Sequence, residues 1–255
     1  GVLPVGLNRA TLLLPYLTKK EKEYMGVIRF GRRVDEAEIK KFFSAFTGEI
    51  EQLPPRKSAV KRVLRKRHVY KFELVELNKN GTDALFNVSC EAGTYVRALV
   101  RDISTKFNIR ARLIELRRTR VGHITEFEAH KLQEVQDAYM IWRDTGDERL
   151  LRRVIKLGST MLNIRRLYID DSTLESLTHG SPLFAPGLRL RSSVLTKHNY
   201  GVLASLNKDD VVGIYTRQNQ LVMIGTMEVS GKEACSMKKG LVVRPKRVIM
   251  TPFNG

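Results

Sequence analysis

Tyr95 and Arg97 are the residues of this sequence best placed to do chemistry, because they follow a glycine turn at the end of a strand-like run. The apolar run 84–90 has the composition of a β-strand, and Gly93 interrupts it just before the two polar side chains. This arrangement places a phenol and a guanidinium at the mouth of a turn. From Val96 onward apolar residues recur on one helix face, so the predicted helix starts at the candidate site. Each residue alone is more often a surface or packing residue, and the pattern by itself leaves both interpretations open.

The densest positive charge lies between Gln52 and His68, where Pro54-Pro55 excludes a helix and predicts a surface loop. Its cationic residues are Arg56, Lys57, Lys61, Arg62, Arg65, Lys66 and Arg67. A solvated face with no partner is the alternative interpretation. We interpret the run as a strip that contacts phosphates, because the loop is predicted to lie next to the candidate site.

The composition indicates a globular protein with an acidic partner. Hydrophobic residues make up 42% of the 255 residues, and the formal net charge is +18. This charge favours nucleic acid as the partner, although general basicity of the ribosomal-protein kind also fits it. Two distant cysteines, Cys90 and Cys235, predict neither a disulfide framework nor a zinc site. No apolar run reaches the ~18 residues of a membrane span, so a cytoplasmic protein is expected.

Hydrophobic periodicity outlines the elements. Residues 24–30 and 69–77 are predicted strands, Asp35 is suited to cap a helix that ends at Phe46, and 128–162 has helical periodicity. From about 163 the chain changes to short β-rich pieces separated by turns, at 167–169, 211–215, 221–225 and 241–243. This spacing is typical of a small β-barrel. We therefore predict two domains, 1–160 and 161–255.

An ordered set of motifs resembles the TruB and dyskerin pseudouridine synthases. The segments that carry the resemblance are GVLPVGL at 1–7, KEKEY at 20–24, Pro54-Pro55 with SAVK at 58–61, GTYVRAL at 93–99 and LRRTRVG at 116–122. The likeness is closest to the archaeal branch of dyskerin. The C-terminal third resembles a PUA RNA-binding domain through 171–172, 178–180, 185–187, 210–214, 221–225 and 247–250. The segment between the PUA-like stretches 185–187 and 210–214, residues 188–206, is longer than the short basic connector of the family.

The resemblance implies a fold and a reaction. The fold is α+β, with a mixed, largely antiparallel sheet and flanking helices, plus a C-terminal PUA β-barrel. The reaction turns uridine into its C-glycoside isomer, which requires the target base to leave the helical stack. The family uses neither a metal nor an organic cofactor for this chemistry.

The resemblance also implies roles for individual residues. Tyr24 corresponds to the aromatic platform for the base, Leu116 to the side chain that packs against uracil, Tyr95 to the phenol beside them and Arg97 to the arginine that aims the catalytic carboxylate. Contacts to RNA are expected from Lys61, Arg62, Arg65, Arg117, Arg118, Arg120 and, in the PUA domain, His179. The arginines of this set could equally support the site. Without the motif, Tyr24 is better explained as a strand residue of the core.

The family's catalytic aspartate comes a few residues before the segment that matches Gly1 to Pro4, and the first aspartate here is Asp35. Asp35 is better explained as a helix cap, and Asp102 matches no catalytic position. We therefore expect the nucleophile to lie upstream of Gly1. The chain as printed is then expected to bind RNA without isomerising it.

The leading hypothesis is the catalytic subunit of an archaeal H/ACA guide-RNA particle that modifies ribosomal or transfer RNA. Its implied partners are the guide RNA, the substrate RNA, the small accessory proteins of the particle and a kink-turn-binding protein, with no membrane. One alternative is a stand-alone TruB-type transfer-RNA enzyme, which finds its uridine without a guide. A noncatalytic RNA-binding scaffold is the other.

Overall fold

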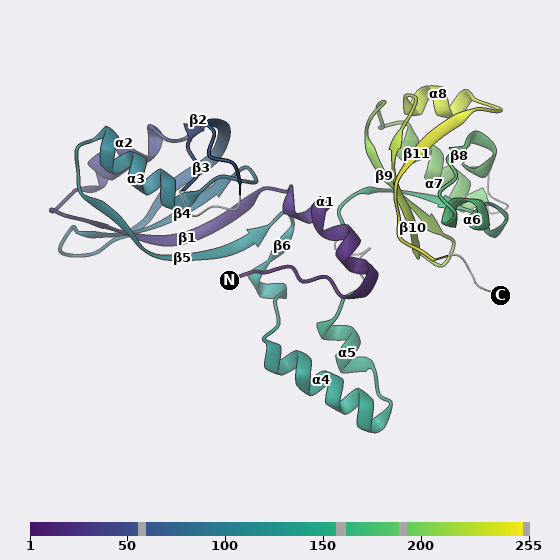
Figure 1. The fold of residues 1–255 in the computed structure, drawn as a ribbon, viewed down its shortest axis with the longest axis horizontal. Coiled ribbons are helices and arrows are strands. Elements are labelled where there is room, and N and C mark those ends of the chain that lie inside the picture. The colour runs from purple at the N-terminus through teal and green to yellow at the C-terminus, as the bar shows by residue number, and fades with distance from the viewer. Residues whose placement is uncertain (56–59, 157–161, 189–192, 252–255) are drawn as a thin grey trace. The chain divides into compact units, whose positions relative to one another are not determined.

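The computed structural model describes residues 1–55, 60–156, 162–188 and 193–251 (Figure 1). Arg56, Lys57 and the motif residues Ser58 and Ala59 lie outside the described residues. The predicted domain boundary at 160 also lies outside them, so the division at that point stays a prediction. The chain groups into two compact units, Gly1–Val5 with Leu14–Ile155 and Gly6–Leu13 with Lys156–Gly255.

The first unit is built on a six-stranded sheet in which every described pairing is antiparallel. The order across the sheet is β2-β3-β4-β1-β5-β6, so β1 lies between β4 and β5. The strands are β1 (Lys22–Phe30), β2 (Gly48–Gln52), β3 (Arg65–Leu77), β4 (Asp83–Cys90), β5 (Ala111–Val121) and β6 (Ile124–Thr125). β3 starts earlier than predicted, because the cationic residues 65–67 pair with β2 instead of remaining in the loop.

Two helices, α2 (Glu36–Ser44) and α3 (Val96–Lys106), cover one face of this sheet (Figure 1). Phe43 of α2 and Leu99 of α3 are fully buried in the same core as Ile28 and Phe86 of the sheet. Burying a side chain of this size contributes roughly 1.5–3 kcal/mol. Asp35 caps α2 as predicted, since its carboxylate accepts a hydrogen bond of 2.8 Å from the Glu38 amide, but the helix ends before Phe46.

The predicted helix over 128–162 is interrupted. A 3-10 turn (Glu126–Glu128) is followed by α4 (Leu132–Thr145) and α5 (Arg149–Val154), which form a hairpin (Figure 1). Gly146 ends α4 with a φ of +75°, in the left-handed region that glycine enters at little cost. Helical periodicity on both sides of Gly146 therefore belongs to two helices. A short helix, α1 (Leu14–Thr18), precedes β1.

The second unit contains a curled five-stranded sheet in the order β7-β9-β10-β11-β8 (Figure 1). Its strands are β7 (Arg165–Ile169), β8 (Leu183–Phe184), β9 (Val211–Thr216), β10 (Leu221–Met227) and β11 (Leu241–Val248). β7 pairs with β9 in parallel, and the other described pairings are antiparallel. The helices are α6 (Asp171–Thr178), α7 (Ser193–Leu203) and α8 (Gly231–Ser236), with 3-10 turns at Asn8–Leu13 and Ala185–Leu188. Strands were predicted at β7, β9, β10 and β11, and the structure contains them.

The segment 188–206, which is longer than the family's connector, contains the helix α7. Asn199 of this helix is fully buried, and its side-chain amide exchanges two hydrogen bonds of 2.8 Å with the backbone of Tyr168 in β7. The same amide donates to the carbonyl of Leu188. A buried amide satisfied on both sides explains why α7 packs against β7.

Candidate active site and RNA-binding surfaces

The register of the first sheet brings the predicted catalytic residues to one end of it. Tyr24 of β1 lies opposite Arg118 of β5. Leu116, two residues before Arg118 on the same strand, lies opposite Gly26. On the other side of β1, Cys90 at the end of β4 lies opposite Lys22. The segment with the predicted phenol and guanidinium leaves β4 at this point, so β1, β5 and the β4–α3 turn meet here.

Tyr24 is half-buried at the edge of the core, where Leu116 also packs. Burial raises the pKa of the Tyr24 phenol, and the Arg118 guanidinium opposes that rise. The phenol therefore stays neutral at physiological pH, and its ring is of the type on which a nucleobase stacks. Burial also raises the pKa of the nearby Cys90 thiol to about 11, so this sulfur is not a nucleophile.

The backbone of Tyr95 is clamped by the side chain of Gln52, the last residue of β2. The Gln52 amide accepts a hydrogen bond of 3.0 Å from the Tyr95 N–H and donates one of 3.2 Å to the Tyr95 carbonyl. Gln52 is only 3% exposed, which shields both bonds from water. Tyr95 is the N-cap residue of α3, but its side chain makes no capping hydrogen bond. The two hydrogen bonds from Gln52 therefore fix the backbone position from which the phenol extends.

Arg97 lies in the first turn of α3 with an exposed side chain, between the buried Val96 and Ala98. Among the described residues its guanidinium has no hydrogen-bond or ion-pair partner. A carboxylate or a phosphate can therefore bind it without displacing an internal contact.

Arg118 supports the beginning of the chain. Its Nε donates a hydrogen bond of 2.8 Å to the Val2 carbonyl, and the Val2 amide donates one of 2.8 Å to the Arg118 carbonyl. Val2 is 4% exposed, so this pairing is part of the packed unit. Burial, followed by the charge of Arg118, lowers the pKa of Lys22, whose ammonium donates to two backbone carbonyls.

Arg120 and Arg117 also have protein partners. The Arg120 guanidinium contacts the carboxylates of Glu21 and Glu23 at 2.5 and 3.6 Å and donates to the Gly122 carbonyl. Arg117 pairs with Glu126 at 2.7 Å, but its side chain is far more exposed. Their predicted contacts to RNA stay predictions, and in the structure Arg120 acts as a support for the strand ends.

The described part of the basic stretch has two kinds of cation. Lys61 and Arg62 are exposed, whereas Arg65 begins β3 and is half-buried. Arg67 turns inward: its Nη2 would stand 3.2 Å from a Cβ placed on Gly93, and its Nη1 lies 3.8 Å from the Glu91 carboxylate. Arg67 therefore packs beneath the turn that leads to Tyr95. Gly93 itself has a φ of +88°, as a break before the site requires.

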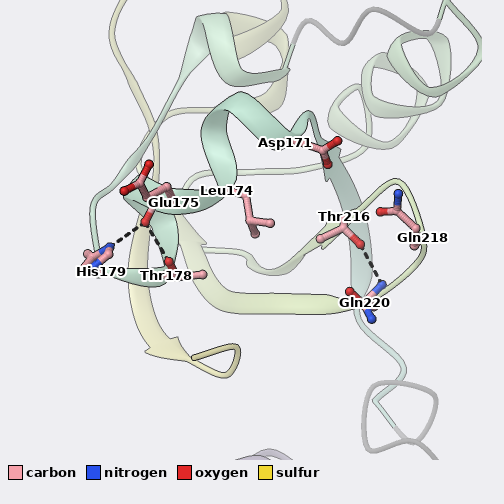
Figure 2. A pocket seen from close by; sticks show the side chains of 8 residues that line it. All are labelled: Asp171, Leu174, Glu175, Thr178, His179, Thr216, Gln218 and Gln220. Carbon is pink, nitrogen blue, oxygen red and sulfur yellow. Dashed lines mark hydrogen bonds between the residues drawn. The ribbon is translucent and has the colours of Figure 1, made fainter. Parts of the chain in front are cut away.

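In the second unit, His179 caps α6, and Gly180 follows with a φ of +89°, a backbone conformation typical of a helix-ending turn. The ring Nδ1 of His179 lies 2.8 Å from the Glu175 carbonyl, which orients the exposed imidazole. A cavity of about 610 Å³ adjoins His179. In Figure 2, Leu174 points into it from α6, and Thr216 and Gln220 line it from the side of the β9–β10 turn.

Two absences hold for the part of the chain that the structure describes. It contains no group of three or more His, Cys, Asp or Glu residues arranged to hold a metal ion. Of its helices, none combines the length and the apolar character that crossing a membrane requires.

Sequence reasoning missed Gln52 as a residue of the site. Nothing local marks it, because its hydrogen-bond partner lies 43 residues further along the chain. Its position two residues before the Pro54-Pro55 motif was the one available signal.

Protein-family models match the chain along most of its length. They are described as TruB family pseudouridylate synthase (N terminal domain), at residues 1–96, tRNA pseudouridylate synthase B C-terminal domain, at 97–167, and PUA domain, at 165–249. A probable tRNA pseudouridine synthase B of Pyrobaculum islandicum is 38% identical over 98% of this chain and 73% of its own length. The protein of the same name from Archaeoglobus fulgidus is 36% identical over 98% and 73%.

The chain belongs to the TruB family of pseudouridine synthases. Among solved structures of this kind, a Cbf5–Nop10–Gar1 complex is similar with a TM-score of 0.83 and 34% identity, over 99% of this chain and 73% of that one. An H/ACA particle bound to a substrate RNA containing 2′-deoxyuridine is similar with a TM-score of 0.80 and 30% identity, over 97% and 71%. The predicted α+β fold with a C-terminal PUA domain is confirmed, as is the predicted family of RNA-modifying isomerases.

Proposed function

We propose that this protein is the synthase subunit of an H/ACA ribonucleoprotein, in which a guide RNA selects the uridine to be converted in ribosomal or transfer RNA. The similarity to the Cbf5–Nop10–Gar1 complex over 99% of the chain supports this proposal most. Its partners in this role are the guide and substrate RNAs, small proteins of the Nop10 and Gar1 kind, and a kink-turn-binding protein.

The reaction breaks the bond between uracil N1 and ribose C1′, rotates the base and forms a new bond between C5 and C1′. Extracting the base from its stack costs roughly a few kcal/mol. In the proposed site the half-buried Tyr24 ring lies under the extracted base, and stacking of this kind is worth about 1–3 kcal/mol. Leu116, which packs at the same edge of the core, contacts the uracil from β5.

Arg97 and Tyr95 complete the proposed site. Arg97 holds the carboxylate that acts on the nucleotide, because its guanidinium is exposed and free of internal partners among the described residues. Two charge-assisted hydrogen bonds keep that carboxylate ionised and aimed. The phenol of Tyr95 stands beside it, with its backbone held by Gln52. By the chemistry of the family, no step uses a metal or an organic cofactor.

Binding of the surrounding RNA is assigned to the cations near this end of the sheet. Lys61, Arg62 and Arg117 are exposed and suited to phosphates, whereas Arg65, Arg118 and Arg120 are half-buried and act mainly as supports. In the PUA unit, the oriented imidazole of His179 is proposed to contact the guide RNA.

Tritium release from RNA labelled at uracil C5 tests the proposal, because bonding through C5 expels that hydrogen. Three samples separate the candidates: a substrate with its matched guide and accessory proteins, the same substrate with a scrambled guide, and a transfer-RNA stem-loop alone. We expect release only with the matched guide. Each sample is tested with the chain as printed and with a version extended at its N-terminus by a segment that carries an aspartate, which separates chemistry from recognition.

A second candidate is the stand-alone transfer-RNA enzyme. The names of the curated relatives, probable tRNA pseudouridine synthase B, favour it. Release from the unguided stem-loop at the rate of the guided substrate would support this candidate and contradict the H/ACA proposal.

A further inference from the structure

The end of the six-stranded sheet away from Tyr24 carries three arginines, two on the neighbouring strands β1 and β5 and one, Arg110, just before β5. Arg29 of β1 lies directly opposite Arg112 of β5, and the Gly31 amide donates a hydrogen bond of 2.7 Å to the Arg110 carbonyl just beyond. These residues line a cavity of about 210 Å³. Arg29 follows Tyr24 by five residues, so it lies about 17 Å away along β1 and on the opposite face of the strand.

The charges of this cluster are only partly balanced within the protein. Arg29 is paired with Asp83 of β4 through two hydrogen bonds of 2.8 and 2.7 Å. Arg110 and Arg112 are exposed and have no carboxylate partner among the described residues. Like charges directly opposite each other on a sheet are destabilising. Asp83 offsets this repulsion at Arg29, and the charges of Arg110 and Arg112 remain available to an anion in the cavity.

Gly31 shapes the cavity. A Cβ at this position would stand 2.8 Å from the Arg110 Cβ and 3.2 Å from its Cδ. The stem of Arg110 thus lies directly over the backbone of Gly31, because no side chain separates them. Arg110 lines the same cavity as Arg29 and Arg112.

We propose that Arg29, Arg110 and Arg112 form a phosphate-binding site that holds an RNA backbone outside the catalytic site. Guanidinium groups match the oxygens of a phosphate with paired hydrogen bonds, and an open cavity admits a phosphate that belongs to a polymer. The net charge of +18 and the membership of a family that modifies RNA favour an RNA strand over a free anion. The site goes beyond the proposed function, because it requires neither a guide nor a reaction.

Binding of a fluorescent RNA duplex of mixed sequence, followed by anisotropy at several salt concentrations, tests the site. The double variant Arg110→Gln with Arg112→Gln is expected to lower the slope of log affinity against log salt by about 2, since each lost phosphate contact removes ~0.9. The matched control is Arg149→Gln with Arg152→Gln, which removes the same charge from two arginines that already pair with Asp147 and Glu148. We expect the control to leave the slope within about 0.5 of the parent.

Equal losses in the two double variants would overturn the proposal, because general charge would then explain binding. An unchanged slope in the Arg110 and Arg112 variant would overturn it directly. Calorimetry with inorganic phosphate distinguishes the source of the anion: tight binding of free phosphate, unaffected by RNA, would assign the site to a small anion instead.

A third variant separates binding from folding. Arg112→Glu replaces the like-charge pair with an opposite-charge pair facing Arg29. We expect its unfolding temperature to rise by about 1–3 °C while its affinity for the duplex falls. If affinity and stability fell together, the arginines would be structural, and the proposal would be wrong.

Discussion

The polar side chains at the two ends of the six-stranded sheet differ in how many partners they have within the protein. At the catalytic end, Tyr95 is clamped by Gln52, and Arg120 is enclosed by Glu21 and Glu23. At the other end, Arg110 and Arg112 are exposed and have no carboxylate partner in the described chain. In the proposed function the first of these ends orients a base, and hydrogen bonds that exist before the ligand arrives lower the cost of reaching the reactive geometry. Positions that only attract a backbone can stay mobile and charged.

The largest effect is expected at Arg97. This arginine differs from the other polar residues at the catalytic end, because its guanidinium has no internal partner among the described residues. Arg97→Ala should lower the single-turnover rate of the active, guide-bound protein about 10²–10³-fold, the size expected for losing one electrostatic partner of the reacting groups. Tritium release from a matched substrate measures it.

The control for this prediction is Arg101→Ala on the same helix. Arg101 is exposed and already paired with Asp102 at 2.8 Å. Similar losses in both variants would mean that α3 needs its charge for folding or RNA binding, and the distinction between the two ends would no longer hold at Arg97.

A smaller effect is expected when the stacking platform is removed. Tyr24→Leu should weaken capture of the extracted uridine by about 1–3 kcal/mol, whereas Tyr24→Phe should retain it, because stacking needs the ring and not the hydroxyl. Fluorescence of 2-aminopurine beside the target base reports the extraction. Tyr70→Leu, at an exposed ring on β3, is the control. Loss of capture in the Phe variant would instead assign the role to the phenol oxygen.

The clamp on Tyr95 is tested by two substitutions of Gln52. Gln52→Leu leaves the N–H of Tyr95 without a partner, whereas the Tyr95 carbonyl keeps the amides of Ala98 and Leu99 as donors, and the variant should destabilise the fold by about 1–3 kcal/mol. Gln52→Glu is more informative, since its carboxylate can accept from the N–H but repels the carbonyl. Its turnover and stability should recover as the pH falls and the carboxyl gains a proton. The exposed Gln136→Glu is the control, and equal pH dependence in both variants would contradict the clamp.

The smallest effect at neutral pH comes from Cys90, beneath the catalytic end. Burial raises the pKa of its thiol to about 11 from an ordinary value of 9.0. The thiol loses its proton at a lower pH in the unfolded chain than in the folded one. The free energy of unfolding is therefore unaffected by this group below pH 9 and falls as the pH rises toward 11, by up to about 3 kcal/mol. Thermal unfolding between pH 8 and about 11 should show the decline. Cys90→Ala should flatten it and Cys235→Ala should not; an equal effect of the two would contradict this assignment.

Several features of the fold follow from residues close together in the sequence. Asp35 caps α2 and Gly93 breaks the chain before Tyr95, both as predicted, and Gly180 follows the end of α6 in a left-handed conformation. Caps and left-handed turns depend on the side chain and backbone of a few consecutive residues, so a single segment contains the information. The same locality misled the prediction for 128–162, where periodicity continues across the break at Gly146.

The order of the motifs determined the family and the fold class, but the partners of individual side chains were decided by the tertiary structure. Arg118 binds the carbonyl of Val2, 116 residues away, and Gln52 binds Tyr95 from another strand. Arg29 faces Arg112 only because β1 and β5 pair in one register. Sequence patterns report periodicity within a segment, whereas such contacts depend on how distant segments are aligned. The sequence alone therefore identified the candidate residues of the site, and the sheet register determined which of them are supports and which are free to bind.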